Sequence, residues 1–124
     1  MEGIAAAREA IDRVDPALML VGRSENFRVP GMAPSESIAR AVAYAEAGAD
    51  CLFVPFLLDH GAVAELVAAV APKPVSVVIH DYDAAGIAAL AALGVRRCSI
   101  GASLAQISWA AFDDAAARLK VAEG

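Results

Sequence analysis

The chain has 124 residues, a length typical of one domain, and 59% of them are hydrophobic while 20% are charged. The net charge is −5 and lysine and arginine form no cluster, so neither nucleic acid nor an anionic membrane surface is expected as a partner. Charges and prolines interrupt the apolar stretches before they could span a bilayer, and the amino terminus carries no signal-peptide pattern, which predicts a cytoplasmic protein.

The first elements follow from apolar spacing and proline. Residues 2–13 are predicted to form a helix, because apolar side chains recur there at helical spacing, and Asp15-Pro16 ends it. The apolar run 17–23 predicts a short strand buried on both faces, as in a parallel sheet. After a polar loop, Ser35 is the predicted N-cap of the second helix.

The same alternation continues to the end of the chain. Further buried strands are predicted at 49–55, 75–79 and 97–100, and the last helix at about 104–121. Strand starts lie about 22 to 33 residues apart, as in βα units. The sequence therefore predicts one α/β domain over residues 1–124. Its four parallel strands are expected in the order 1-2-3-4, with the helices on one face because crossovers are right-handed.

Glycines and aspartates mark the helix ends. Gly48 and Gly94 each stand between a predicted helix and the next strand, as a glycine after a helix commonly does. Asp59 is a candidate N-cap of the third helix, and Asp81 or Asp83 of the fourth. With His60 and His80 these acids could instead serve acid–base or metal chemistry, although neither group forms a recognisable motif.

The cysteines and the large aromatic residues of the last helix are predicted to be structural. Cys51 and Cys98 lack the close spacing of a metal or redox pair and fall within predicted strands, so we expect buried thiols. Trp109 and Phe112 are expected to pack rather than to hold a cofactor.

Candidate ligand-binding residues follow from where the strands end, because parallel α/β folds bind ligands at the carboxyl ends of their strands. Arg23 ends the first strand and could hold a carboxylate or phosphate through two parallel hydrogen bonds, or pair with Glu25 instead. Gly101 and Ser103 join the last strand to the last helix, where backbone N–H groups attract anions. The Ser103 hydroxyl could alternatively cap that helix.

Several segments, in order and spacing, are similar to one family. They are Val21-Gly22-Arg23-Ser24-Glu25, Ile38-Ala39-Arg40-Ala41, Tyr44-Ala45-Glu46-Ala47-Gly48-Ala49-Asp50, Leu52-Phe53-Val54-Pro55, Pro72-Lys73-Pro74-Val75-Ser76-Val77 and Leu93-Gly94-Val95-Arg96-Arg97-Cys98-Ser99-Ile100-Gly101. From about residue 17 onward the chain resembles the isocitrate lyase/phosphoenolpyruvate mutase superfamily.

The resemblance implies half of a TIM (β/α)₈ barrel, namely its C-terminal four βα units. Members cleave or form C–C or C–P bonds beside a carboxylate and use Mg²⁺, so it implies a lyase or mutase acting on a small α-keto or hydroxy carboxylate. It places the family's substrate-binding arginine at Arg23, where the family's Ala-Arg-Thr-Asp reads Gly-Arg-Ser-Glu here.

The departures from the family concern the chemistry. The metal-holding acids and the flexible catalytic loop belong to earlier strands of the barrel, so the catalytic residue is unknown and no metal is expected for this chain alone. Pro55 stands where members often have His or Glu, and Ser76 where many have Asn. We therefore expect the chain to be inactive by itself.

Two alternatives remain open at this point. The chain could be a half-barrel that assembles with itself or with a complementing chain, or a non-enzymatic, flavodoxin-like binding module. A half-barrel leaves two strand edges open. It also exposes an inner face, expected to carry an apolar set or its alternates: Leu20, Leu52, Val54, Val77 and Ile100. This exposure predicts a homo-oligomer or a complementing partner.

Overall fold

The computed structural model describes residues 1–25, 31, 33–55, 57, 59–79 and 83–119. Within them the helices are α1 Glu2–Val14, α2 Pro34–Glu46, α3 His60–Val70, α4 Ala84–Ala92 and α5 Ser103–Arg118. The strands are β1 Val21–Arg23, β2 Cys51–Phe53, β3 Val75–Val78 and β4 Arg97–Ser99. Every predicted element is present, in the predicted order. The strands are shorter than their apolar runs, since the hydrogen-bonded ladders cover only three or four residues of each.

The four strands form one parallel sheet in the order β1-β2-β3-β4, as predicted. Each strand pairs with the next one in the chain, so the sheet has no point at which the strand order reverses. A flavodoxin-like fold needs such a reversal, and it carries helices on both faces of its sheet. The flavodoxin-like alternative is therefore wrong.

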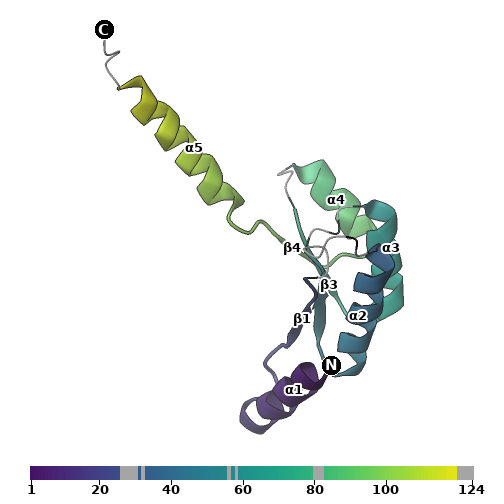
Figure 1. Cartoon of the computed structure of the whole chain (residues 1–124). Coiled ribbons are helices and arrows are strands. Elements are labelled where there is room, and N and C mark those ends of the chain that lie inside the picture. Colours follow the sequence, from purple (N-terminus) through teal and green to yellow (C-terminus); the bar gives the residue numbers. More distant parts are fainter. Residues whose placement is uncertain (26–30, 32, 56, 58, 80–82, 120–124) are drawn as a thin grey trace.

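One face of the sheet is covered by helices, and α2, α3 and α4 all lie on that side (Figure 1). The buried core lies between this face and the helices. Leu52 and Val54 of the second unit and Val77 of the third belong to this core, where they are at most 1% exposed. The sequence left open whether these side chains or their alternates line the open face, and the structure puts these three in the core. Their alternates in the strands occupy the open face, because successive strand residues point to opposite faces.

Local signals at the helix ends behave largely as predicted. Asp59 caps α3 by accepting a hydrogen bond from the Ala62 N–H at 2.8 Å, and Asp83 caps α4 in the same way. The N-cap of α2 is Ala33 rather than Ser35, and the Glu36 carboxylate accepts the Ala33 N–H at 3.0 Å. The helix therefore begins at Pro34, whose fixed φ suits the first helical position.

Two helices end at glycines with a left-handed backbone, as the spacing predicted. Gly48 follows α2 with φ +107°, and Gly94 follows α4 with φ +96°. This region of the backbone map favours glycine, because a Cβ would crowd the backbone there. Each glycine thus turns the chain from a helix into the next strand.

An ion pair attaches α1 to the end of the sheet where the strands begin. Arg8 donates to the Asp50 carboxylate at 2.7 Å and to the Leu18 carbonyl at 3.3 Å. The same Asp50 oxygen accepts the Leu20 N–H at 2.7 Å. One carboxylate therefore ties α1, the approach to β1 and the start of β2 together.

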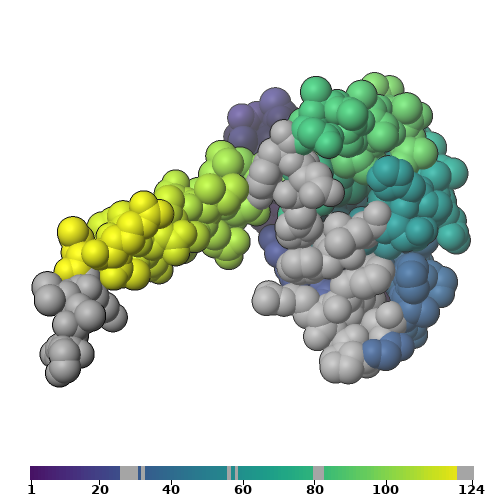
Figure 2. All heavy atoms as spheres, turned by 90° about the horizontal axis from the view of Figure 1, so that it is seen from above, coloured from purple at the N-terminus to yellow at the C-terminus, as the bar shows by residue number. Residues whose placement is uncertain are grey.

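The last helix departs from the predicted arrangement. Instead of packing on the helix-covered face, α5 projects away from the sheet (Figures 1 and 2), and none of its residues is buried. Trp109 is 63% exposed and Phe112 is 72% exposed, so the expectation that they pack is wrong for this chain. No helix among the described residues is long and apolar enough to cross a membrane.

Candidate functional site

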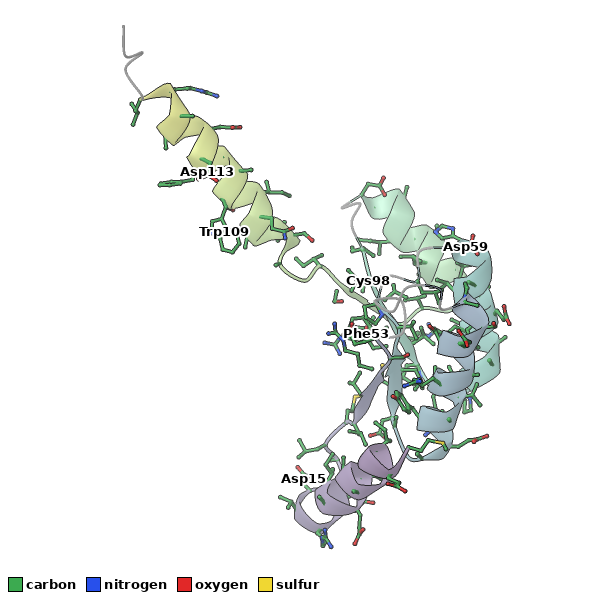
Figure 3. All side chains as sticks on the ribbon, in the orientation of Figure 1. Asp15, Phe53, Asp59, Cys98, Trp109 and Asp113 are labelled. Atoms are coloured by element: carbon green, nitrogen blue, oxygen red, sulfur yellow. The ribbon has the colours of Figure 1, made fainter. Side chains whose placement is uncertain are left out.

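The face of the sheet opposite α2 and α3 is open and holds a hollow of about 610 Å³. It lies toward the carboxyl ends of the strands. The residues that line it are Arg23, Phe53, Pro55, Ser76, Val78, Arg97, Ser99, Ile100, Gly101, Ala102, Ser103 and Gln106. All four strands and the start of α5 contribute. Phe53 marks this side of the sheet in Figure 3. The hollow thus occupies the position at which parallel α/β folds bind ligands.

Four lining side chains share one row across the sheet. Arg23 is in register with Phe53, Phe53 with Ser76, and Ser76 with Arg97. Residues in register on neighbouring parallel strands lie side by side on the same face. We call this set the arginine row, because an arginine stands at each end and an aromatic ring and a hydroxyl lie between.

Arg23 makes two contacts within the described residues. Its Nε atom donates a hydrogen bond to the Glu25 carboxylate, and its guanidinium carbon lies 5.0 Å from the centre of the Phe53 ring. The side chain is still 51% exposed. The ion pair that the sequence offered as an alternative is therefore present. It uses Nε and leaves the two terminal nitrogens without a hydrogen bond to any described residue. Binding of a substrate by Arg23 stays a prediction.

Gly101 and Ser103 lie on another wall of the hollow, between β4 and α5. Gly101 has φ +54°, a left-handed backbone that turns the chain out of the strand. The N-cap of α5 is Ala102, and the Ser103 hydroxyl donates to the Ile100 carbonyl at 2.7 Å. The alternative that Ser103 caps the helix is therefore wrong. Its role toward a substrate stays a prediction.

Gln106 and Arg97 are polar lining residues that were not predicted as site residues. Gln106 stands three residues after Ser103 on α5, a spacing that places side chains on the same helix face and could have suggested it. Arg97 begins β4, and sequence reasoning treated it as part of a buried strand. Pro55 and Ser76, the two positions at which the chain departs from the family pattern, also line the hollow.

Cys51 lies on the same face of the sheet, in register with Val21 and two residues before Phe53. It is 3% exposed, and this burial raises the pKa of the thiol, while the positive charge of Arg97 acts in the opposite direction. A thiol with a raised pKa is protonated at neutral pH and is a poor nucleophile. Cys51 is therefore the buried, free thiol that the sequence predicted, and Cys98 is free and half-buried.

The acidic and histidine residues that follow β2 and β3 do not come together as a site in the described chain. Asp59 and Asp83 are helix caps, as above, and His60 is an exposed first residue of α3. His80 and Asp81 lie outside the described residues. Among the described residues no three His, Cys, Asp or Glu side chains gather as metal ligands.

Magnesium is the cofactor that the family resemblance implies. Mg²⁺ is bound through carboxylate oxygens in near-octahedral geometry. The described lining of the hollow carries two arginines, hydroxyls and an amide, but no carboxylate. These residues therefore do not fit a magnesium site by themselves.

Comparison with known proteins shows which family this chain resembles in sequence and structure. The sequence profile of the phosphoenolpyruvate phosphomutase family matches residues 1–120. A candidate lyase/mutase from Burkholderia cenocepacia J2315 is 36% identical, with a TM-score of 0.87, over 99% of this chain and 44% of its own. A phosphoenolpyruvate phosphomutase from Streptomyces platensis subsp. rosaceus is 27% identical, with a TM-score of 0.72, over 90% of this chain and 38% of its own.

A third structure, oxaloacetate acetylhydrolase in complex with the product oxalate, is 25% identical, with a TM-score of 0.75, over 94% of this chain and 40% of its own. No curated protein sequence matches the chain. The chain thus spans less than half the length of each of these three structures.

The sheet order and these likenesses define an α/β chain of four βα units with a TIM-barrel-like arrangement. The chain belongs to the phosphoenolpyruvate phosphomutase family. The family resemblance found in the sequence is therefore confirmed, as is the fold class that it implied.

Proposed function

We propose that this chain is the C-terminal part of a lyase or mutase that cleaves a C–C or C–P bond in a small α-keto or hydroxy carboxylate. The observation that carries the proposal is the position of Arg23. It ends β1 and faces the hollow, and Gly101 and Ser103 line the same hollow from the start of α5.

The contacts of Arg23 suit the binding of a carboxylate. Its Nε atom is held by Glu25 and its guanidinium lies over Phe53, so the plane of the fork is restrained before a ligand arrives. The terminal nitrogens can then donate two parallel hydrogen bonds to a carboxylate or a phosphonate. A restrained fork loses less rotamer freedom on binding than a mobile one.

Gly101 and Ser103 have a second role in this proposal. The Ser103 N–H donates to the Ile100 carbonyl at 3.2 Å, but the next N–H groups in the first turn of α5 make no helical hydrogen bond within the described residues and favour negative charge. Together with Arg23 they would hold a small anion from two sides. The relative solved with oxalate is itself described as acting on a carboxylate, which is consistent with this class of ligand.

The bond-breaking step is assigned to groups outside the hollow's described lining. That lining offers no carboxylate to hold Mg²⁺ and no ionised nucleophile, since the Cys51 thiol is buried with a raised pKa. In this proposal the chain supplies substrate-binding residues, Mg²⁺ is a cofactor of the assembled barrel, and the chain alone does not turn over substrate. Assembly would come from a second copy or from a complementing chain.

The test is a titration of the 124-residue chain with oxalate at low ionic strength, followed by ¹H–¹⁵N NMR. Oxalate should shift the Arg23 side-chain and the Gly101 and Ser103 backbone signals. Arg23→Lys should weaken binding about tenfold, because lysine keeps the charge but loses the planar fork.

Arg40→Lys is the matched control. Arg40 is an exposed residue of α2 that does not line the hollow, so its replacement should leave the affinity unchanged. If the unmodified chain shows no shift at these signals, or if Arg23→Lys binds oxalate as tightly as the unmodified chain, the proposal is wrong.

A further inference from the structure

Arg97 is a second arginine on the open face, and its place follows from the sheet register. It begins β4 and pairs with Ser76, which pairs with Phe53, which pairs with Arg23. Three strand spacings therefore separate the two arginines, about 14 Å along the sheet. Both line the same hollow, whereas the neighbouring Arg96 does not.

The described lining of the hollow carries two positive charges, of which that of Arg23 is paired with Glu25. The chain carries a net charge of −5, yet the described residues lining the hollow include two guanidinium groups and no carboxylate. The four ion pairs formed within the described residues use Arg8, Arg13 and Arg23 as their cations. Glu25 therefore already offsets the charge of Arg23, whereas Arg97 belongs to none of these four ion pairs and can attract an anion.

The groups between the two arginines are suited to a ligand that spans them. The Phe53 ring offers an apolar surface, and the Ser76 residue, 2% exposed, supplies a hydroxyl beside Arg97. Ser99, two residues after Arg97 on the same face of β4, adds another hydroxyl to the lining. The arginine row thus has a cation at each end and an apolar segment with hydroxyls between.

We propose that Arg97 contacts a second anionic group of the ligand that Arg23 holds, so that this site selects ligands with two anionic groups over ligands with one. The inference rests on the proposed function, because it takes Arg23 as the first anion-binding residue. It adds a residue that determines specificity and predicts how its replacement changes the choice of ligand.

The position of Arg97 also allows a purely structural role. Its positive charge lowers the pKa of the Cys51 thiol, which lies on the same face. In a structural role the guanidinium would contribute to the stability of the fold and not to ligand binding. The two roles differ in what Arg97→Gln changes. A structural role alters the stability of the fold, and a ligand-binding role alters the ratio of affinities for two ligands.

The experiment compares succinate, which has two carboxylates, with acetate, which has one, at equal ionic strength. Dissociation constants come from ¹H–¹⁵N NMR titrations of the 124-residue chain and its variants. In the unmodified chain succinate should bind more tightly than acetate. Arg97→Gln should weaken succinate binding about tenfold and change acetate binding less than about twofold, because one charge-assisted contact is lost.

Matched variants separate the possible outcomes. Arg96→Gln removes the same charge one residue earlier and should change neither affinity. Arg23→Gln should weaken both ligands. Urea unfolding of each variant checks the fold. If Arg97→Gln unfolds the chain, Arg97→Lys takes its place, with a smaller loss for succinate because lysine keeps the charge without the fork.

Two results would overturn the inference, and they have different meanings. If the unmodified chain binds neither ligand, the proposed function fails with it. If binding depends on Arg23 but Arg97→Gln and Arg97→Lys keep the original ratio of succinate to acetate affinity, Arg97 is structural and the proposed function stands.

Discussion

Arg23 and Arg97 stand at the two ends of one row of side chains that crosses all four strands, through Phe53 and Ser76. They are the last residue of β1 and the first residue of β4, so the row runs diagonally with respect to the strand ends. Their positions on the open face bring two cations to the same hollow. The opposite face of the same strands is apolar and packs against helices.

We expect Cys51 to react with iodoacetamide more slowly than Cys98 in the folded chain. Cys51 is 3% exposed, and burial raises the pKa of its thiol, so less of the reactive thiolate is present at a given pH. Arg97→Gln removes a charge that lowers this pKa, and should slow the reaction of Cys51 further. Mass spectrometry of the two cysteine peptides measures both rates, and equal rates would contradict the expected protection.

The same thiol gives a pH dependence of stability. Because the pKa of Cys51 is higher in the folded chain than in the unfolded chain, the unfolded chain releases the proton first as the pH rises. The free energy of unfolding should therefore be unaffected by this group below the ordinary thiol pKa and should fall above it. Cys51→Ala should reduce this alkaline loss in urea titrations, and an unchanged alkaline slope would rule the thiol out as its source.

Gly94→Ala should destabilise the chain by about 1–3 kcal/mol, since the backbone is strained there for a residue with a side chain. The φ of Gly94 is +96°, and an added Cβ would lie 2.8 Å from Cγ1 of Val67. Gly3→Ala is the control, because nothing lies within 4 Å of its Cβ position in α1, and alanine there should be stabilising by about 0.5–1 kcal/mol. Urea unfolding measures both, and a neutral Gly94→Ala would show that the turn relaxes.

Asp59→Ala should cost about 1 kcal/mol of stability, because it removes the side chain that caps α3. Asp59→Ser should retain most of that stability, since serine caps a helix nearly as well as aspartate. Thermal unfolding of the three chains separates the cap from a role of the negative charge. Equal losses in both variants would indicate that charge, rather than capping, is what Asp59 supplies.

The chain is expected to self-associate at micromolar concentration through α5. Leu104, Trp109 and Phe112 are 53%, 63% and 72% exposed on this projecting helix, and burying such side chains is favourable by about 25 cal/mol per Å². Replacing Trp109 and Phe112 by serine should shift sedimentation toward the monomer, while Ser108→Ala should not. A compact monomer of the unmodified chain would contradict the expectation.

The sequence alone was sufficient for the order and type of the elements, because their signals are local. Buried parallel strands appear as short apolar runs, and helix ends are marked by residues whose backbone or side chain suits one position, such as Gly48, Gly94 and Asp59. Ser35 shows the limit of such signals, since Pro34 starts the helix one residue earlier. The family resemblance added the TIM-barrel type of the fold, and it assigned substrate binding to Arg23, which stays a prediction.

The tertiary structure decided which face of the sheet each strand residue occupies and which side chains lie next to each other on that face. The run Cys51-Leu52-Phe53-Val54 is apolar throughout, so it carries no alternation from which the helix-facing residues could be predicted. Packing against α2 and α3 selects Leu52 and Val54 for the core and leaves Cys51 and Phe53 on the open face. Tertiary structure likewise decided that Arg97 lines the same hollow as Arg23. Strand register puts the two arginines in one row, and register depends on contacts between residues distant in sequence, which leave no local pattern.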